Sequence, residues 1–256
     1  MNKIRNAFED RKAFIAYLTA GDPDLETTKE LILTMEQTGV DVIEIGIPSE
    51  NIPVELSELQ ESNRRGIEAG TTAEDVFNMI LSLNKTVRVP LVVLAYLDTI
   101  REYGISRFMR KCKECSVEGL IVPDLVYEER NEISRDCDLF GVDLLSIIHP
   151  SSRDEIATIA KKAKGFIYCE SSPEKLGQDN EVDYSEMVAI IRGNGKVPCA
   201  MGFGITTPDQ AKNLARIGDG VVIASGILRT IEEYGKNCVV PVREYIRTMK
   251  AALRQA

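Results

Sequence analysis

Histidine is nearly absent from this sequence, which contains only His149. A single imidazole excludes metal sites built from several histidines, and a Ser-His-Asp triad could form only through it. Long apolar runs are also lacking. No stretch is long enough to span a bilayer, and the first residues do not contain the apolar region of a signal peptide. We therefore expect a cytoplasmic protein with no membrane-spanning segment.

Basic residues are outnumbered, since 31 Lys and Arg stand against 40 Asp and Glu and give a formal net charge of -9. This balance argues against nucleic acid or an anionic membrane as a partner. The six cysteines are scattered along the chain, which suits reduced thiols. Cys112 and Cys115 form a C-x-x-C motif inside a helical pattern, without a second pair, and we interpret them as half-buried helix residues. The sequence predicts neither a metal site nor a cofactor.

Apolar runs typical of buried strands alternate with amphipathic helical patterns along the whole chain. The eight expected strands cover residues 13–18, 42–47, 90–96, 119–122, 142–148, 166–168, 197–201 and 220–223. A helix is expected after each strand, and the one over 72–83 is expected to begin with a capping pair of Thr71 and Glu74. No change in composition marks a second domain. We predict one (β/α)₈ TIM barrel over residues 1–256, with an extra N-terminal helix and a long C-terminal helix from Val239.

One carboxylate lies inside the most apolar strand. Glu44 is flanked by Ile43 and Ile45, and a charge at such a place costs several kcal/mol unless it is paired, hydrogen-bonded or protonated. One interpretation is a structural ion pair with a buried Arg or Lys. The other is a catalytic acid or base that faces the barrel interior with a raised pKa.

The strand ends carry two further features, because the carboxyl ends of barrel strands hold the catalytic loops. Glycines at 202 and 204 follow the seventh strand, and Ala224-Ser225-Gly226 follows the eighth and opens a helix. Backbone N–H groups of such loops favour a phosphate, although the glycines could also serve only tight turns. Glu55 and Asp124 are further carboxylates at the strand ends, and with Glu44 they could divide acid and base roles.

At these positions the sequence resembles the tryptophan synthase α subunit family. The resemblance covers nearly the whole chain and rests on residues 17–23 (YLTAGDP), 42–48 (VIEIGIP), 119–125 (GLIVPDL), 165–168 (GFIY) and 202–208 (GFGITTP). It implies a lyase of tryptophan biosynthesis, which cleaves indole-3-glycerol phosphate to indole and glyceraldehyde 3-phosphate in a retro-aldol reaction. It also implies a small phosphorylated substrate and a tryptophan synthase β subunit as partner.

The resemblance also implies roles for single residues. Glu44 matches the catalytic glutamate, which protonates the indole ring, and Glu55 falls at the second acid, near the indole nitrogen. The substrate-binding positions implied or expected are Tyr168, Tyr96, Gly177, Gly204 and Ser225.

Two loops depart from the family pattern. The second loop reads SENIPVE over residues 49–55 instead of a Phe-Ser-Asp-Pro segment, and Leu176 replaces the threonine of the sixth loop, a lid over the substrate. His149 stands where the family has small or apolar residues, and we interpret it as an ordinary core or loop residue. From these departures we predict a weak lyase. The alternatives are a non-catalytic paralogue that binds a phosphorylated ligand or a partner chain, and an enzyme for another phosphorylated substrate.

Overall fold

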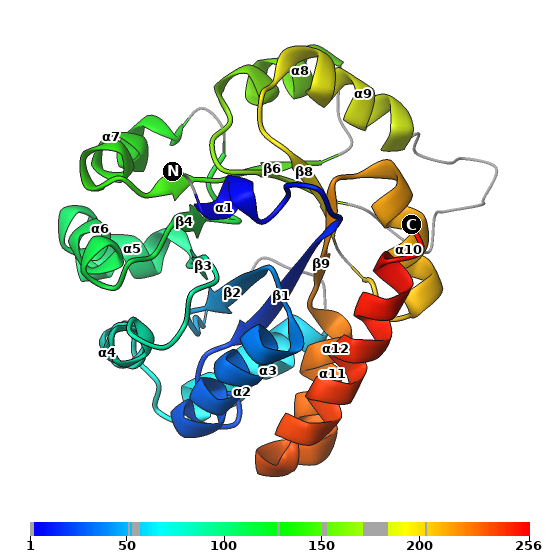
Figure 1. Ribbon diagram of the computed structural model, residues 1–256. Coiled ribbons are helices and arrows are strands. Elements are labelled where there is room, and N and C mark those ends of the chain that lie inside the picture. The colour runs from blue at the N-terminus through cyan, green and yellow to red at the C-terminus, as the bar shows by residue number, and fades with distance from the viewer. Residues whose placement is uncertain are drawn as a thin grey trace.

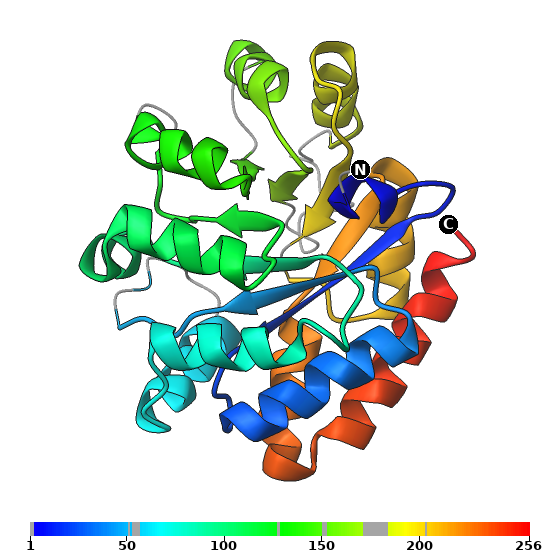
Figure 2. The same cartoon turned by 60° about the vertical axis from the view of Figure 1, so that its left-hand side comes forward.

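A computed structural model describes residues 3–50, 52, 57–126, 129–149, 153–170, 184–202 and 204–256. Its centre is one parallel sheet with the strand order β5-β4-β3-β2-β1-β9-β8-β7-β6. The strands are β1 (Ala13–Thr19), β2 (Val42–Gly46), β3 (Leu91–Leu94), β4 (Gly119–Ile121), β5 (Asp143–Leu144), β6 (Ser146–Ile148), β7 (Ile167–Glu170), β8 (Cys199–Gly202) and β9 (Gly220–Ile223). Helices surround the strands on the outside (Figures 1 and 2).

The two ends of this strand order are consecutive in the chain. Only Leu145 separates β5 from β6, and β5 pairs with β4 while β6 pairs with β7. The expected strand over 142–148 is therefore one strand, whose first half is bonded to one neighbour and whose second half is bonded to the other. It closes the barrel, so the nine segments are the eight predicted strands and the TIM-barrel prediction is confirmed.

The helices pack with their apolar sides against the strands. They are α1 (Lys3–Asn6), α2 (Leu25–Thr38), α3 (Ser57–Glu68), α4 (Ala73–Leu83), α5 (Leu97–Tyr103), α6 (Ile105–Glu114), α7 (Asn131–Phe140), α8 (Arg153–Lys162), α9 (Tyr184–Asn194), α10 (Pro208–Ile217), α11 (Ser225–Tyr234) and α12 (Val239–Leu253), with a 3₁₀ turn η3 (Gly235–Asn237). The extra N-terminal helix and the long C-terminal helix are both present, as predicted.

Helix α2 shows how local sequence sets these elements. Asp24 caps its start by accepting the Thr27 N–H at 2.7 Å, and Gly39 ends it with a φ of 88°, which favours glycine. Between the caps, Leu31, Ile32 and Met35 are buried on one face, as their spacing predicts.

Two helix predictions are wrong in detail. The α4 capping box joins Thr72 and Asp75, one residue later than predicted, and Glu74 instead accepts the Tyr103 hydroxyl hydrogen at 2.5 Å. Helix α5 was not predicted, because only Leu97 and Ile100 are buried in it and its apolar period is too short to recognise.

The described part of the chain contains no helix that is long and apolar enough to cross a membrane. All six cysteines are buried free thiols. Among the same described residues, no group of three His, Cys, Asp or Glu side chains is arranged to hold a metal ion.

Candidate active site

The position of Glu44 in the barrel follows from the strand register. Glu44 is paired with Tyr17 of β1 on one side and with Val92 of β3 on the other, and Val92 is paired with Gly119. Register partners in a sheet point to the same face. On this face a Cβ at Gly119 would lie 3.1 Å from the Ile4 side chain of α1, and α1 lies over the opening of the ring of strands in the view of Figure 1. Glu44 therefore faces the barrel interior, as predicted.

Among the residues that the structure describes, no cation forms an ion pair with this carboxylate. The Glu44 side chain is buried, none of the ion pairs of the described residues includes it, and its Oε2 has no hydrogen-bond partner in that part of the chain. Burial raises its pKa from 4.5 to about 8, because a desolvated carboxylate disfavours its charge. The structural ion pair is thus ruled out among the described residues, and the carboxyl group is held as a neutral acid near pH 7.

Two tyrosines flank Glu44. The Tyr17 hydroxyl fills the space above Gly46, where a Cβ would lie 2.1 Å from it, and is bonded to Thr19 Oγ1 at 3.1 Å. Thr19 is bonded in turn to Ser62 of α3 at 2.8 Å. This chain of hydroxyl groups was missed in the sequence, because Ser62 lies 43 residues from Thr19 and no local pattern joins them.

Tyr96 is the second flanking tyrosine, and it was predicted as a substrate-binding residue. Its hydroxyl is buried without a hydrogen-bond partner among the described residues. Burial, followed by the charges of Asp124 and Glu44, raises its pKa. Buried polar atoms are rarely left unbonded, and two of them in one interior indicate a place for a ligand with a donor and an acceptor.

Asp124 follows a strand end, and from the sequence it was therefore considered as a catalytic acid or base. Both of its carboxylate oxygens accept the Leu97 N–H, at 3.0 and 3.1 Å. Asp124 therefore satisfies an unpaired N–H at the start of α5 rather than standing free as a third acid.

The loops after β8 and β9 are brought together by α12. The Tyr245 hydroxyl donates to the Thr206 carbonyl at 3.2 Å and lies where a Cβ on Gly226 would be, 1.9 Å away. Gly204 has a φ of 63°, a conformation that favours glycine. Ser225 is the first residue of α11 and is buried. The predicted residues Gly204 and Ser225 thus belong to one loop pair beside a helix N-terminus.

Two backbone N–H groups of this loop pair already donate hydrogen bonds within the protein. Gln210 Oε1 accepts the N–H groups of Thr206 and Thr207, at 2.9 and 3.1 Å, and so caps α10. Those two N–H groups are not available to a phosphate. A phosphate would depend on the backbone next to Gly204 and on the start of α11.

Tyr168 lies on the same interior face as the buried acid. It is paired with Ala200, and Ala200 with Gly220. Gly220 is paired with Ala13, which is four residues before Tyr17 and on the same side of β1. The Tyr168 ring also covers Gly202 of β8, where a Cβ would lie 2.6 Å from it.

Comparison with known proteins identifies the family of this barrel. The family model described as "Tryptophan synthase alpha chain" matches residues 4–254. The chain belongs to the tryptophan synthase alpha chain family.

Relatives and solved structures agree with this membership. The tryptophan synthase alpha chain of Thermoanaerobacter sp. (strain X514) is 35% identical over 262 residues, which cover 99% of this chain and 100% of the relative. That of Lacticaseibacillus casei is 34% identical over 255 residues, with 99% and 96% covered. A crystal structure of tryptophan synthase subunit alpha from Legionella pneumophila str. Paris is 27% identical, covers all of both chains and has a TM-score of 0.89.

Membership of the tryptophan synthase alpha chain family confirms the predicted activity, retro-aldol cleavage of indole-3-glycerol phosphate by a lyase of tryptophan biosynthesis. Within this family, two predicted site residues of the chain, Glu55 and Gly177, lie outside the described residues, as does Leu176. The structure brings Glu44, Tyr96 and Tyr168 to one interior.

His149 and Glu170 form an ion pair at the rim of the barrel. His149 follows β6, and its Nδ1 contacts the Glu170 carboxylate at the end of β7. Glu170 raises the pKa of His149 by favouring the charged ring. Glu170 was not predicted as a partner of His149, because the pair is formed by two strand ends that are 21 residues apart in the chain.

Proposed function

We propose that Glu44 is the group that transfers the proton in indole-3-glycerol phosphate cleavage. In the retro-aldol step, C3 of indole takes the proton of the Glu44 carboxyl group and the bond between C3 and the glycerol chain breaks, while the adjacent chain hydroxyl returns a proton to the Glu44 carboxylate and becomes the aldehyde carbonyl. A neutral carboxyl group is the donor that C3 requires. The observation that carries this proposal is the buried Glu44, which has no ion-pair partner among the described residues and a pKa of about 8.

The other predicted residues are proposed as binding groups. Tyr96 offers its hydroxyl, which has no hydrogen-bond partner in the described part of the chain, and Tyr168 offers a ring on the interior face. The backbone near Gly204 and the N-terminus of α11 at Ser225 favour the phosphate. Glu55, as second acid near the indole nitrogen, and Gly177, as a further phosphate position, are proposed from the family resemblance alone.

We also propose a tryptophan synthase β subunit as partner, a cytoplasmic location, and a single domain over residues 1–256. Family membership supports the partner. A chain of a solved "tryptophan synthase complex from Pyrococcus furiosus" has the same fold, with a TM-score of 0.86 at 23% identity. The single barrel sheet supports the single domain.

The decisive experiment measures indole and glyceraldehyde 3-phosphate formed from indole-3-glycerol phosphate, with and without a β subunit. Formation of both products in equal amounts would support the proposed chemistry. Binding of the substrate without products would favour the non-catalytic alternative, for which the altered second and sixth loops argue.

The pH dependence of turnover follows from the raised pKa of Glu44. If the neutral carboxyl group is the donor, kcat is expected to be constant below pH 7 and to fall as pH rises through about 8, by about tenfold per pH unit. Steady-state indole formation between pH 6 and 10 measures this. A kcat that rises through pH 8 would show that Glu44 acts as a base.

The altered loops are expected to make turnover slow. A misplaced acid can cost on the order of 100-fold in rate, and Glu55 belongs to a rewritten loop. Restoring a family-type second loop together with Leu176→Thr is expected to raise kcat more than the two single changes predict, because both act on one closed state. Single-turnover assays of the four variants measure this. Turnover of the unaltered chain equal to that of an ordinary family member would contradict it, and so would no gain in the double variant.

A further inference from the structure

A cavity of about 430 Å³ lies at the opposite end of the barrel from Glu44. Its walls come from α1, the segment before β1, the α2–β2 turn, the segment before β3, and α12. All strands are parallel, so residues that precede strands lie at the amino-terminal end, away from the catalytic loops. The cavity is therefore separate from the proposed active site.

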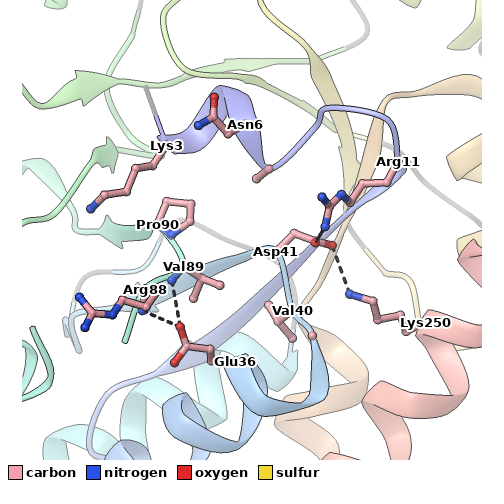
Figure 3. Close-up of a pocket in the computed structure, with 12 residues that line it drawn as sticks. Lys3, Asn6, Arg11, Glu36, Val40, Asp41, Arg88, Val89, Pro90 and Lys250 are labelled. Atoms are coloured by element: carbon pink, nitrogen blue, oxygen red, sulfur yellow. Dashed lines mark hydrogen bonds and ion pairs between the residues drawn. The ribbon is translucent and has the colours of Figure 1, made fainter. Parts of the chain in front are cut away.

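Charged side chains from five separate segments line this cavity (Figure 3). Four are cations and two are carboxylates: Lys3, Arg11, Arg88 and Lys250, with Glu36 and Asp41. The chain as a whole has a net charge of -9. This hollow has more positive than negative groups, in contrast to the chain as a whole, and it favours an anion locally.

The two carboxylates do not neutralise all four cations. Glu36 Oε1 accepts the backbone N–H groups of Arg88 and Val89, at 2.5 and 3.0 Å. Its bonds thus hold the backbone of the Arg88 segment and leave the guanidinium free to point elsewhere. In the described part of the chain, the Arg88 guanidinium has no hydrogen bond or ion pair. It is an exposed fork of donors on an anchored backbone.

Asp41 is shared between two cations. Its carboxylate accepts the Phe14 N–H at 3.0 Å and lies 3.4 Å from both Arg11 Nη1 and Lys250 Nζ. Both ion-pair distances are long for charge-assisted bonds. Arg11 and Lys250 lie near Asp41 in Figure 3, so one carboxylate holds two cations at the cavity wall.

Two of the four cations that line the cavity have a structural role. Helix α2 ends at the cavity, and Lys250 Nζ lies 3.0 Å from where a Cβ on Gly39 would be. A cation there complements the negative end of the helix. Lys3 is paired with Glu118 at 2.7 Å. The positive charges of Arg88 and Arg11 are accounted for neither by a helix end nor by a carboxylate of their own.

We propose that this cavity binds a small phosphate-bearing anion at Arg11 and Lys250, and that the Arg88 guanidinium, which points away from them in Figure 3, turns inward to complete the site. A guanidinium binds two phosphate oxygens at once, and the two cations at Asp41 can turn from their long contacts toward a dianion. The volume exceeds that of inorganic phosphate, so a phosphate ester of a few carbon atoms also fits.

The test follows backbone amide signals of the full chain by NMR during titration with inorganic phosphate and, separately, glycerol 3-phosphate. The amide signals of Gly39, Arg88 and Val89 are expected to shift in a saturable way. The dissociation constant obtained from them is expected to differ from the one obtained from the amide signals of Gly204 and Ser225. Tighter binding of glycerol 3-phosphate than of phosphate at this end would identify an ester as the ligand, and equal binding would identify free phosphate.

Two matched variants each remove one positive charge. Arg88→Gln is expected to weaken binding at this end about tenfold or more and to leave indole formation unchanged. Lys85→Gln, at an exposed residue outside the cavity lining, is expected to leave the affinity unchanged. The proposal is overturned if the two variants weaken binding equally, or if neither anion causes saturable shifts at this end.

Discussion

Replacing Glu44 with glutamine is expected to lower the kcat of indole formation by about 10²–10⁴-fold, the usual contribution of a well-placed acid. Glutamine has nearly the same shape but cannot donate a proton to indole C3. Because Glu44 is neutral below pH 8, the substitution removes no charge from the interior at pH 7. The fold and the binding of phosphate at the Gly204 loop are therefore expected to persist.

The stability of Glu44→Gln provides an independent check. The folded-state pKa of Glu44, about 8, lies above its ordinary value of 4.5, so the folded protein holds this proton more tightly than the unfolded chain. That stabilisation is complete below pH 4.5 and is lost as pH rises to about 8. In urea unfolding, the variant should therefore gain stability relative to the unaltered protein between pH 4.5 and 8.

Glu102→Gln, at an exposed position on α5, serves as the matched control and should change neither kcat nor this pH dependence. Unchanged kcat in Glu44→Gln, with the fold intact, would remove Glu44 from the mechanism and favour an acid in one of the loops.

Replacing Asp22 with alanine is expected to lower the free energy of unfolding by about 3 kcal/mol, because it leaves a largely buried guanidinium without its main partner. Arg65 of α3 donates to both Asp22 oxygens, at 2.7 and 2.9 Å, and Asp22 is fully buried. The third guanidinium nitrogen forms an ion pair with Glu232 of α11 at 3.2 Å. The bridge thus joins the loop after β1 to two helices at the catalytic end.

Arg64 on the same helix is a matched control. It pairs with Glu61 and Glu68, but its side chain is 54% exposed, so Arg64→Ala is expected to lower the free energy of unfolding much less than Asp22→Ala does. Urea unfolding of Asp22→Ala and Arg64→Ala at pH 7 compares them. Equal, small losses would show that the buried bridge contributes no more than a surface pair.

The elements of the barrel were readable from the sequence, because each depends on near neighbours. Strands show as short β-branched runs, and α2 is set by Asp24, Gly39 and a helical apolar period. The errors have the same local origin. Helix α5 has too few apolar residues to show a period, and Thr71 and Thr72 are both chemically able to cap, so that only the backbone decided between them.

In the candidate site, too, some features follow from the order of residues along the chain and others only from tertiary contacts. The sequence by itself determined that Glu44 lies in a buried strand and that Gly204 and Ser225 follow the last two strands, since these depend on order along the chain. Only the tertiary structure decided that Glu44 has no cation beside it among the described residues, that Asp124 binds the start of α5, and that Tyr245 joins the loops after β8 and β9. The pKa of a buried carboxyl group is set by whichever side chains surround it. In a closed barrel those side chains come from strands and helices far apart in the sequence, so no local pattern contains them.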